Sequence, residues 1–227
     1  RDKIVEYKQS VVGQLNKGIA ALAKKRQVQV VHGTAEFIGS HRLKVGATDI
    51  EFEQAIIATG SQPIHLPFMP NDPRVMDSTQ ALDLPKLDGK LLVIGGGIIG
   101  CEMATVYQAF GMDVSVVEMF DQIMPGVDPD LVKPCQQMME KRGITIRTET
   151  KIENVTASKK HLEATLVLKD GTTVSEQYDL ILQSIGRKPN SHGIGLEAVG
   201  IEVDDRGFII VDELYRTKLP HIYAVGD

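Results

Sequence analysis

One stretch decides the fold: Leu91 to Glu118, with the sequence LLVIGGGIIGCEMATVYQAFGMDVSVVE. It begins with a short apolar run, residues 91–94, that predicts a buried strand, and three glycines then lead into a helical pattern over residues 98–110. A second apolar run, residues 114–117, predicts another buried strand that carries Glu118 at its carboxyl end. A strand, a tight turn, a helix and a second strand in this order predict a Rossmann βαβ unit.

The glycines of the turn, Gly95, Gly97 and Gly100, have G-x-G-x-x-G spacing. In a dinucleotide-binding turn, the first glycine permits the tight turn and the second lets the backbone approach a pyrophosphate at the helix N-terminus. The third lets helix and strand pack closely. Glu118 lies eighteen residues after Gly100, where an acid can accept hydrogen bonds from a ribose diol and would repel a 2′-phosphate. The pattern favours NAD over NADP; a structural glycine turn and a merely solvated strand-end acid are the alternative interpretations.

The composition limits the classes of function. The chain has 227 residues, 42% of them hydrophobic, which suits one large or two modest domains with a sizeable core. Its net charge of −5 argues against nucleic-acid binding. We find neither a signal-peptide pattern nor a membrane-spanning run, so we expect a cytoplasmic or matrix-like protein with no membrane partner. Cys101 and Cys135 suit neither a zinc site nor a C-x-x-C pair, so we expect buried, reduced thiols and no metal.

Upstream of the glycine turn, the pattern predicts a long amphipathic helix over residues 1–26, followed by short strands. The predicted strands and meander cover residues 28–31, 42–45, 50–52 and 55–58. Residues 62–90 contain five prolines, a density that forbids a long regular element and predicts a stiff connection between domains.

Downstream, Asp128 and Pro129 predict the start of a helix that runs towards Arg142, with a kink or a late start at Pro134. The later strands are predicted from short apolar runs at residues 144–147, 152–157, 162–168, 180–185, 208–211 and 222–225, with a turn at Asp170-Gly171. Residues 190–206 hold several glycines and few apolar runs, which predicts a second crossing between domains.

Three of the predicted strands end with the same sequence pattern. Residues 56–60, 181–186 and 222–226 are apolar strands that finish in a glycine with a small or polar neighbour. Ligands of open α/β sheets lie beyond the carboxyl ends of the strands. These ends are compatible with a second nucleotide site, but for each end taken alone the spacing favours ordinary strand termination.

Together these segments resemble the pyridine nucleotide-disulfide oxidoreductase family, and within it the members that oxidise dihydrolipoamide. The resemblance is carried by AIIATGSQP (55–63), LLVIGGGIIGCE (91–102), VVEMFDQIMPGVD (116–128), LILQSIGRKPN (180–190) and VDDRGFIIVDELYRTKLPHIYAVGD (203–227). These segments extend over most of the chain in the family's order.

The resemblance implies an α/β fold in which a Rossmann-like NAD domain is inserted in a partial FAD-binding domain of the same type. The NAD domain would have three layers, with a parallel sheet and an antiparallel β-meander. Residues 88–206 would form it, and residues 1–87 and 207–227 would belong to the FAD domain.

Several family features have no counterpart in the sequence: the first G-x-G-x-x-G, the C-x-x-x-x-C redox disulfide, and the C-terminal dimerisation domain with its His and Glu acid–base pair. We therefore expect an internal piece of a longer enzyme, with no catalytic residue of its own and no turnover by itself.

The resemblance also implies the residues that contact each cofactor. For NAD they are Gly95, Gly96, Gly97, Ile98, Ile99, Gly100, Glu102, Glu118, Ile152, Gly186 and Arg187. For FAD they are Ala35, Thr59, Gly60, Ser61 and Asp227. Glu102 is expected as a buried acid near the nicotinamide and the flavin, with an acid favoured by the helix dipole as the alternative. Arg187 has a surface ion pair as its alternative role.

The implied parent enzyme oxidises dihydrolipoamide on a lipoyl domain of a 2-oxoacid dehydrogenase complex, passes electrons through FAD to NAD, and forms a homodimer. One alternative is a dinucleotide-binding module without catalysis. Another is a related flavoprotein such as a mercuric or glutathione reductase, which prefers NADPH and carries basic residues near the position of Glu118.

Overall fold

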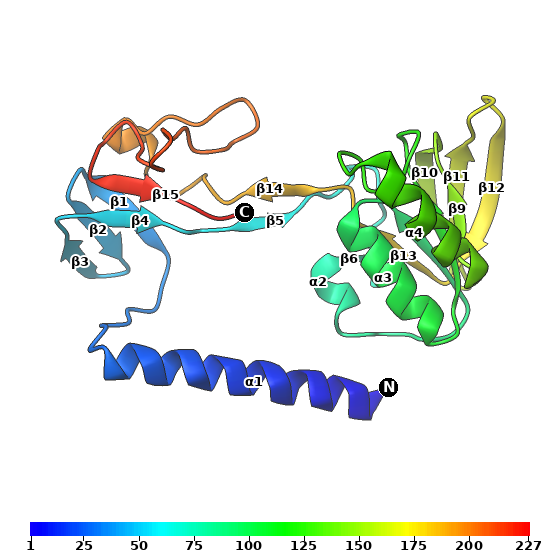
Figure 1. Ribbon diagram of the computed structural model, residues 1–227, viewed down its shortest axis with the longest axis horizontal. Helices are drawn as coiled ribbons and strands as arrows, with labels where there is room; N and C mark the ends of the chain where they lie inside the picture. The colour runs from blue at the N-terminus through cyan, green and yellow to red at the C-terminus, as the bar shows by residue number, and fades with distance from the viewer. The chain divides into compact units, whose positions relative to one another are not determined.

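The computed structural model describes residues 1–227, which divide into two compact units (Figure 1). The first unit comprises Arg1–Val5 and Pro63–Gly186, and the second comprises Glu6–Gln62 and Arg187–Asp227. The first unit begins earlier and ends earlier than the NAD domain predicted for residues 88–206. The assignment of NAD to one unit and FAD to the other stays a prediction.

A five-stranded sheet with the order β6-β13-β7-β8-β9 forms the centre of the first unit. Its strands are β6 (Val75–Asp77), β7 (Lys90–Ile94), β8 (Asp113–Val117), β9 (Thr145–Arg147) and β13 (Leu180–Gln183). All neighbouring pairs are parallel. Because β7 and β8 pair from Lys90↔Asp113 to Ile94↔Val117, their carboxyl ends lie at the same edge of the sheet.

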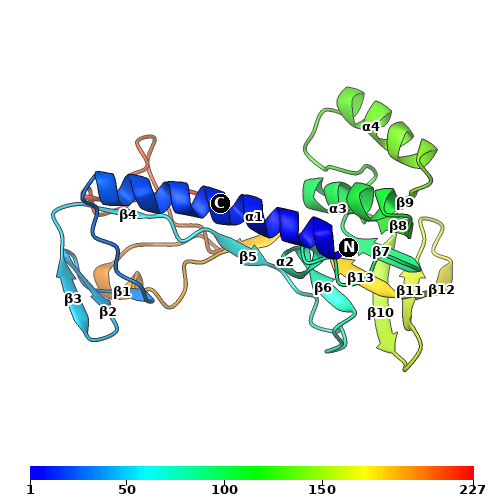
Figure 2. The same cartoon turned by 90° about the horizontal axis from the view of Figure 1, so that it is seen from below.

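Helices cover one face of this sheet and an antiparallel meander covers the other, which Figure 2 shows from below. The helices are α2 (Ser78–Ala81), α3 (Ile98–Ala109) and α4 (Pro129–Lys141), and the meander is β10 (Lys151–Ala157), β11 (Leu162–Val167) and β12 (Thr173–Tyr178). Leu91 and Val93 pack into the core on the helix side, whereas Leu92 and Ile94 pack into the core on the meander side. The predicted three-layer α/β arrangement is confirmed.

Short strands and one long helix make up the second unit. Its elements are most of α1 (Asp2–Lys25), β1 (Ala35–Gly39), β2 (Arg42–Val45), β3 (Thr48–Glu51), β4 (Ala55–Ile57), β5 (Ser61–Pro63), β14 (Arg187–Pro189), η1 (Glu197–Val199) and β15 (Ile222–Ala224). β1, β2 and β3 form an antiparallel sheet, β15 pairs parallel with β4, and β14 lies beside β5. Phe37, Ile57 and Ile222 are buried in the core of this unit.

Two predicted strands are wrong. Residues 28–31 form no strand and pair with no neighbouring strand, and Val28 and Val30 are 57% and 60% exposed. Residues 208–211 form only an isolated bridge between Val203 and Ile209. A β-prone run becomes a strand only where a neighbour pairs with its backbone, which the run itself does not encode.

Other expectations need smaller corrections. The helix α1 is present, but none of its residues is buried. The helix α4 begins at Pro129 with Asp128 as its N-cap, so a late start at Pro134 is wrong. The proline-rich region 62–90 contains β6 and α2, two short elements that the proline count obscured. No helix combines the length and the apolar character that a membrane span requires.

An ion pair before β6 gives the first unit a pH-dependent stability. The guanidinium of Arg74 donates from Nε and NH2 to Asp72 Oδ1 and Oδ2 over 2.8 and 2.7 Å, and these hydrogen bonds lower the pKa of Asp72 from 3.8 to about 2. Because the pKa is lower in the folded state, the stabilisation is fully present above pH ~4 and disappears as the pH falls towards 2.

We expect Asp72→Asn to lower the free energy of unfolding by about 1–2 kcal/mol at pH 7 and to have little effect near pH 2. Urea unfolding at both pH values measures the difference. Asp88→Asn is the matched control, because the side chain of Asp88 is 86% exposed and lies 3.9 Å from its nearest cation, Lys86. Equal destabilisation at both pH values would contradict the assignment to this ion pair.

Candidate nucleotide-binding site

The predicted glycine turn joins β7 to α3 at the carboxyl edge of the parallel sheet. Gly95 has φ +97°, in the region that favours glycine, and a Cβ there would lie 2.5 Å from the carbonyl oxygen of Ser184. The amide of Gly95 donates to Val117 O over 2.9 Å, which ties the turn to the end of β8. The turn is thus fixed between the ends of its two neighbouring strands.

Gly97 caps the N-terminus of α3 without a side-chain hydrogen bond. A Cβ at this position would meet nothing within 4 Å, so the backbone borders open space. The first amides of a helix lack intrahelical acceptors, and the helix dipole favours negative charge beside them. This turn therefore fits a phosphate group that approaches the backbone closely.

Gly100 lies where α3 meets β7. A Cβ there would lie 2.0 Å from Gly95 O and 2.7 Å from Ser184 Oγ. The hydroxyl of Ser184 is within hydrogen-bonding distance of Ile94 O (3.1 Å) and Gly95 O (2.9 Å). Ser184 is a supporting residue that the sequence interpretation did not single out, although it lies in a strand end, residues 181–186, that was recognised as ligand-facing.

Glu118 is buried, with 5% of its surface exposed. Its Oε2 accepts a hydrogen bond from the amide of Gly96 (2.7 Å), and its Oε1 accepts one from the amide of Phe120 (3.0 Å). Its own amide donates to Arg147 O over 2.9 Å. A carboxylate oxygen can accept more than one hydrogen bond, so Glu118 is held against the glycine turn with acceptor capacity left for a ligand.

The loop after Glu118 is tied to the chain that precedes β10. The amide of Thr150 donates to Glu118 O, and the amide of Glu149 donates to Phe120 O, over 2.9 and 2.8 Å. Ile152 follows two residues later, but it packs against the core on the meander side. Phe120 is 53% exposed and offers an apolar surface next to Glu118.

The remaining residues predicted for NAD differ in exposure. Ile98 is 59% exposed and Ile99 is half-buried. The expectation of a buried acid at Glu102 is wrong: Glu102 is exposed, because Cys101 and Ala104 occupy the inner face of α3. Gly186, with φ +128°, ends the first unit.

Both cysteines are free thiols. Cys101 is buried as predicted, and its Sγ donates to Gly96 O over 3.3 Å. Burial raises the pKa of Cys101 to about 11, so the thiol stays protonated and unreactive at neutral pH. Cys135 is only half-buried, contrary to the prediction, because α4 turns one side towards solvent. The structure brings together no group of His, Cys, Asp and Glu suited to a metal ion.

Three predicted residues form one hydrogen-bonded group in the second unit. The hydroxyl of Ser61 donates to Asp227 Oδ2 (2.8 Å) and accepts from Arg187 Nε (2.7 Å). Arg187 also donates to Ser61 O over 2.7 Å and lies 3.5 Å from Asp227. Arg187 was predicted with the NAD residues, yet it contacts two residues that were predicted for FAD.

The Thr59-Gly60 segment is fixed by Asn190, which the sequence interpretation missed as a site residue. The amide of Asn190 donates to Gly60 O, and its side chain donates to Thr59 O, over 2.9 and 3.0 Å. The only sequence feature that could have indicated Asn190 as a site residue was its place at the end of the segment 180–190. Ala35 lies at the start of β1 and is exposed.

Comparisons with known proteins identify the family of the chain. The whole chain, residues 1–227, matches the family described as pyridine nucleotide-disulphide oxidoreductase. It is 45% identical to a dihydrolipoyl dehydrogenase of Vibrio cholerae, over 100% of the chain and 48% of that protein. It is 46% identical to one of Haemophilus influenzae, again over 100% and 48%.

A solved structure gives the same result for the fold. The HOCl-induced flavoprotein disulfide reductase RclA from Escherichia coli matches with a TM-score of 0.88 and 30% identity, over 98% of this chain and 51% of that chain. The chain spans about half the length of the curated relatives it matches.

Proposed function

Because the chain belongs to the pyridine nucleotide-disulphide oxidoreductase family, we propose that it is the central part of a dihydrolipoyl dehydrogenase. The whole enzyme would oxidise dihydrolipoamide with FAD and use NAD as the acceptor. The identity of 45% with a relative of that name supports this activity. The observation that carries the nucleotide-binding role is the buried carboxylate of Glu118, held at a glycine turn that borders open space at Gly97.

Different residues of the first unit would bind different parts of the NAD molecule. The uncapped N-terminus of α3 would attract the pyrophosphate, and Gly97 would let it approach the backbone. Glu118 would accept hydrogen bonds from a ribose diol and repel a 2′-phosphate. When bound, the two cofactors supply the hydride-transfer chemistry, and the chain supplies binding and orientation.

The second unit would hold part of the FAD. Asp227 offers a carboxylate that suits a ribityl or ribose hydroxyl, and Ser61 and Arg187 fix its position. Arg187 would therefore serve the FAD site rather than the NAD site. Thr59 and Gly60 would lie beside the flavin, and Ala35 on its adenine side.

The units would correspond to the two cofactor domains, with the first unit binding NAD. The whole enzyme would act in the cytoplasm, as a homodimer, on the lipoyl domain of a 2-oxoacid dehydrogenase complex. The chain alone would bind NADH without turnover, because the family's C-x-x-x-x-C pair and its His–Glu acid–base pair have no counterpart among these residues.

Titration of the chain with NADH and NADPH tests the proposal. We expect saturable NADH binding and at least about tenfold weaker NADPH binding, measured by calorimetry at constant ionic strength. Equal or tighter binding of NADPH would favour a mercuric- or glutathione-reductase-like parent. If NADH binds but the whole enzyme does not reduce NAD with dihydrolipoamide, the alternative of a binding module without catalysis holds instead.

The substitution Glu118→Gln should weaken NADH binding about tenfold and narrow the discrimination against NADPH. A glutamine would place its NH2 group against the amide of Gly96 or Phe120, and it would lose the charge that repels a 2′-phosphate. Asp121→Asn is the matched control, because Asp121 is an exposed acid three residues later. An unchanged ratio of the two affinities would remove Glu118 from the proposed ribose site.

A further inference from the structure

The end of β8 leads into apolar side chains that the fold leaves uncovered. Met119 and Phe120 are each more than half exposed, although they directly follow the buried Glu118. Ile98, which follows Gly97 at the start of α3, is also more than half exposed. Exposed apolar side chains are ordinary where they are scattered, but these three border the proposed nucleotide site. The site therefore has an apolar margin beside its acid.

The backbone of Phe120 is fixed to the proposed ribose acid. Its amide donates to Glu118 Oε1 over 3.0 Å, and its carbonyl oxygen accepts from the amide of Glu149 over 2.8 Å. Both polar groups of this backbone are therefore satisfied by the protein. The aromatic ring, in contrast, is largely exposed, and it is held next to Glu118 before any ligand binds.

Glu149, which holds Phe120, is itself anchored. It has φ +50°, a left-handed conformation that residues other than glycine seldom adopt. Its carboxylate forms an ion pair with Lys169 in the turn between β11 and β12. The next residue, Thr150, donates its amide to Glu118 O over 2.9 Å. One short segment thus fixes the chain after β8 at two points, so a ligand that contacts Phe120 has little loop motion to arrest.

The strand order places three features in a row along the carboxyl edge of the sheet. The strands β7, β8 and β9 are adjacent and parallel, and the glycine turn follows β7, Glu118 follows β8, and Glu149 follows β9. The carboxylate of Glu118 bridges the turn and Phe120, since Oε2 accepts from the amide of Gly96 and Oε1 from that of Phe120. The row therefore consists of an amide-rich turn, a carboxylate and an aromatic ring.

The adenosine half of a dinucleotide has matching groups in the same order. The pyrophosphate and the base are attached to opposite ends of the ribose, and the diol lies between them along one edge. With the pyrophosphate at the glycine turn and the diol at Glu118, the base points away from the turn and towards Phe120. An aromatic side chain can stack on a nucleobase, because every base has a π-face.

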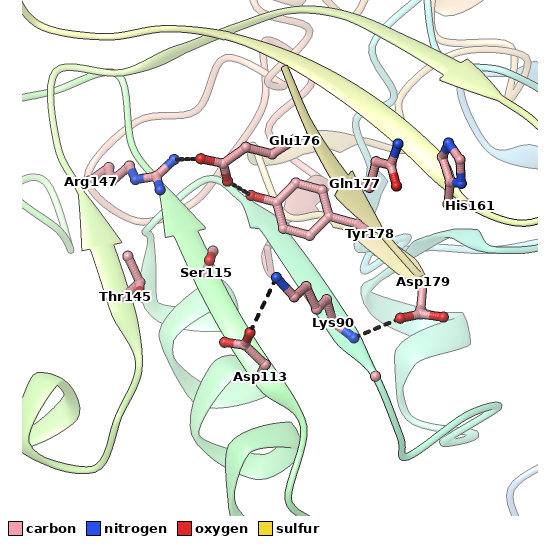
Figure 3. Close-up of a pocket in the computed structure, with 11 residues that line it drawn as sticks. Lys90, Asp113, Ser115, Thr145, Arg147, His161, Glu176, Gln177, Tyr178 and Asp179 are labelled. Atoms are coloured by element: carbon pink, nitrogen blue, oxygen red, sulfur yellow. Dashed lines mark hydrogen bonds and ion pairs between the residues drawn. The ribbon is translucent and has the colours of Figure 1, made fainter. Parts of the chain in front are cut away.

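The opposite edge of the sheet, where β7, β8 and β9 begin, is polar instead. A cavity there is lined by charged and hydroxyl groups, among them Lys90, Asp113, Arg147 and Glu176. Figure 3 shows these charges in pairs: Arg147 with Glu176, and Lys90 with Asp113. Paired charges offer an aromatic base little apolar surface to cover. The uncovered apolar side chains at the carboxyl edge are therefore the better match for a nucleobase.

We propose that the ring of Phe120 stacks on the adenine base of bound NAD(H) and fixes that end of the cofactor, an inference that rests on the proposed binding of NAD by the first unit. Ile152, which was also predicted to contact NAD, packs against the core on the meander side, so its side chain is not free to stack. Phe120 is thus a specificity-determining residue, because it favours ligands that carry a base next to the ribose held by Glu118.

Calorimetric titration with NADH compares the original chain with three variants. Phe120→Ala should weaken NADH binding about tenfold, the effect of removing one base–aromatic stack. Phe120→Tyr keeps the ring and should bind NADH within about twofold of the original chain. Phe208→Ala is the matched control and should bind NADH unchanged, because Phe208 is an exposed phenylalanine of the second unit. Melting temperatures establish that each variant is folded.

The adenine H2 and H8 resonances of NADH give a readout that a merely structural role of Phe120 would not move. Protons over the face of an aromatic ring are shifted upfield by its ring current. We expect upfield adenine shifts when NADH binds to the original chain or to Phe120→Tyr. Phe120→Leu keeps an apolar side chain without a ring, so these shifts should be lost.

The outcomes separate this proposal from the proposed function. Unchanged NADH affinity in Phe120→Ala, or weaker binding with unchanged adenine shifts in Phe120→Leu, would overturn the stacking and leave the role of Glu118 in place. Absence of NADH binding to the original chain would overturn the proposed function and the stacking together.

Discussion

Replacing Gly97 by alanine should weaken NADH binding more than about a hundredfold while leaving the melting temperature of the chain unchanged. Gly97 has φ −66° and ψ −177°, a conformation that alanine adopts without strain. An added Cβ would meet nothing within 4 Å, so the fold has room for it. The same open space is where we propose that the pyrophosphate contacts the backbone, and a methyl group would occupy it.

Calorimetric titration with NADH and a thermal melt of the same sample measure the two effects. Gly18→Ala is the matched control, because a Cβ at Gly18 would also meet nothing within 4 Å, whereas Gly18 lies in α1, away from the glycine turn in the sequence. It should leave the NADH affinity unchanged, and it should not lower the melting temperature, because alanine favours a helix by about 1 kcal/mol over glycine. An NADH affinity for Gly97→Ala within about twofold of the original chain would show that no ligand approaches this turn.

The core of the candidate site could be predicted from sequence because its information is local. The order of strand, glycine turn, helix and strand fixes the path of residues 91–118. The spacing of the glycines limits the backbone conformations that the turn can adopt. Glu118 follows its strand directly, so the parallel pairing of β7 and β8 brings it to the turn.

Contacts between distant segments could not be predicted in the same way. Ser184 reaches Gly95 O from beyond the end of β13, and Asn190 reaches Gly60 O from beyond β14. Nothing near either residue in the sequence identifies its partner. The family resemblance assigned Arg187 to NAD together with Gly186, whereas its hydrogen bonds run to Ser61.

Exposure was the other quantity that local patterns did not determine. Glu102 lies near the glycine turn in the sequence, but the face of α3 that packs on the sheet is set by Cys101, Ala104 and Tyr107. The run at residues 28–31 has strong β propensity, yet no strand pairs with it. In both cases, the deciding factor was the packing partner rather than the residue type.

Replacing Gly100 by alanine should destabilise the fold itself. This differs from Gly97→Ala, which should lower the NADH affinity and leave the fold intact. The added Cβ would lie 2.0 Å from Gly95 O, a backbone atom that the turn holds in place. Alanine favours helices by about 1 kcal/mol over glycine, which offsets only part of the clash. We expect a net loss of about 3 kcal/mol, or a melting temperature lower by about 6–12 °C.

A second substitution separates the two contacts that the new methyl group would make. Ser184 Oγ would lie 2.7 Å from it, and Ser184→Gly removes that side chain but not the clash with Gly95 O. The double variant Gly100→Ala/Ser184→Gly should therefore recover little of the melting temperature, since Ser184 also loses its contacts to Ile94 O and Gly95 O. Full recovery would show that the side chain of Ser184, rather than the turn backbone, sets the distance between α3 and β7.

A Gly100→Ala variant as stable as the original chain would mean that the helix can move away from the sheet at little cost. The close packing at the third glycine would then have no structural role.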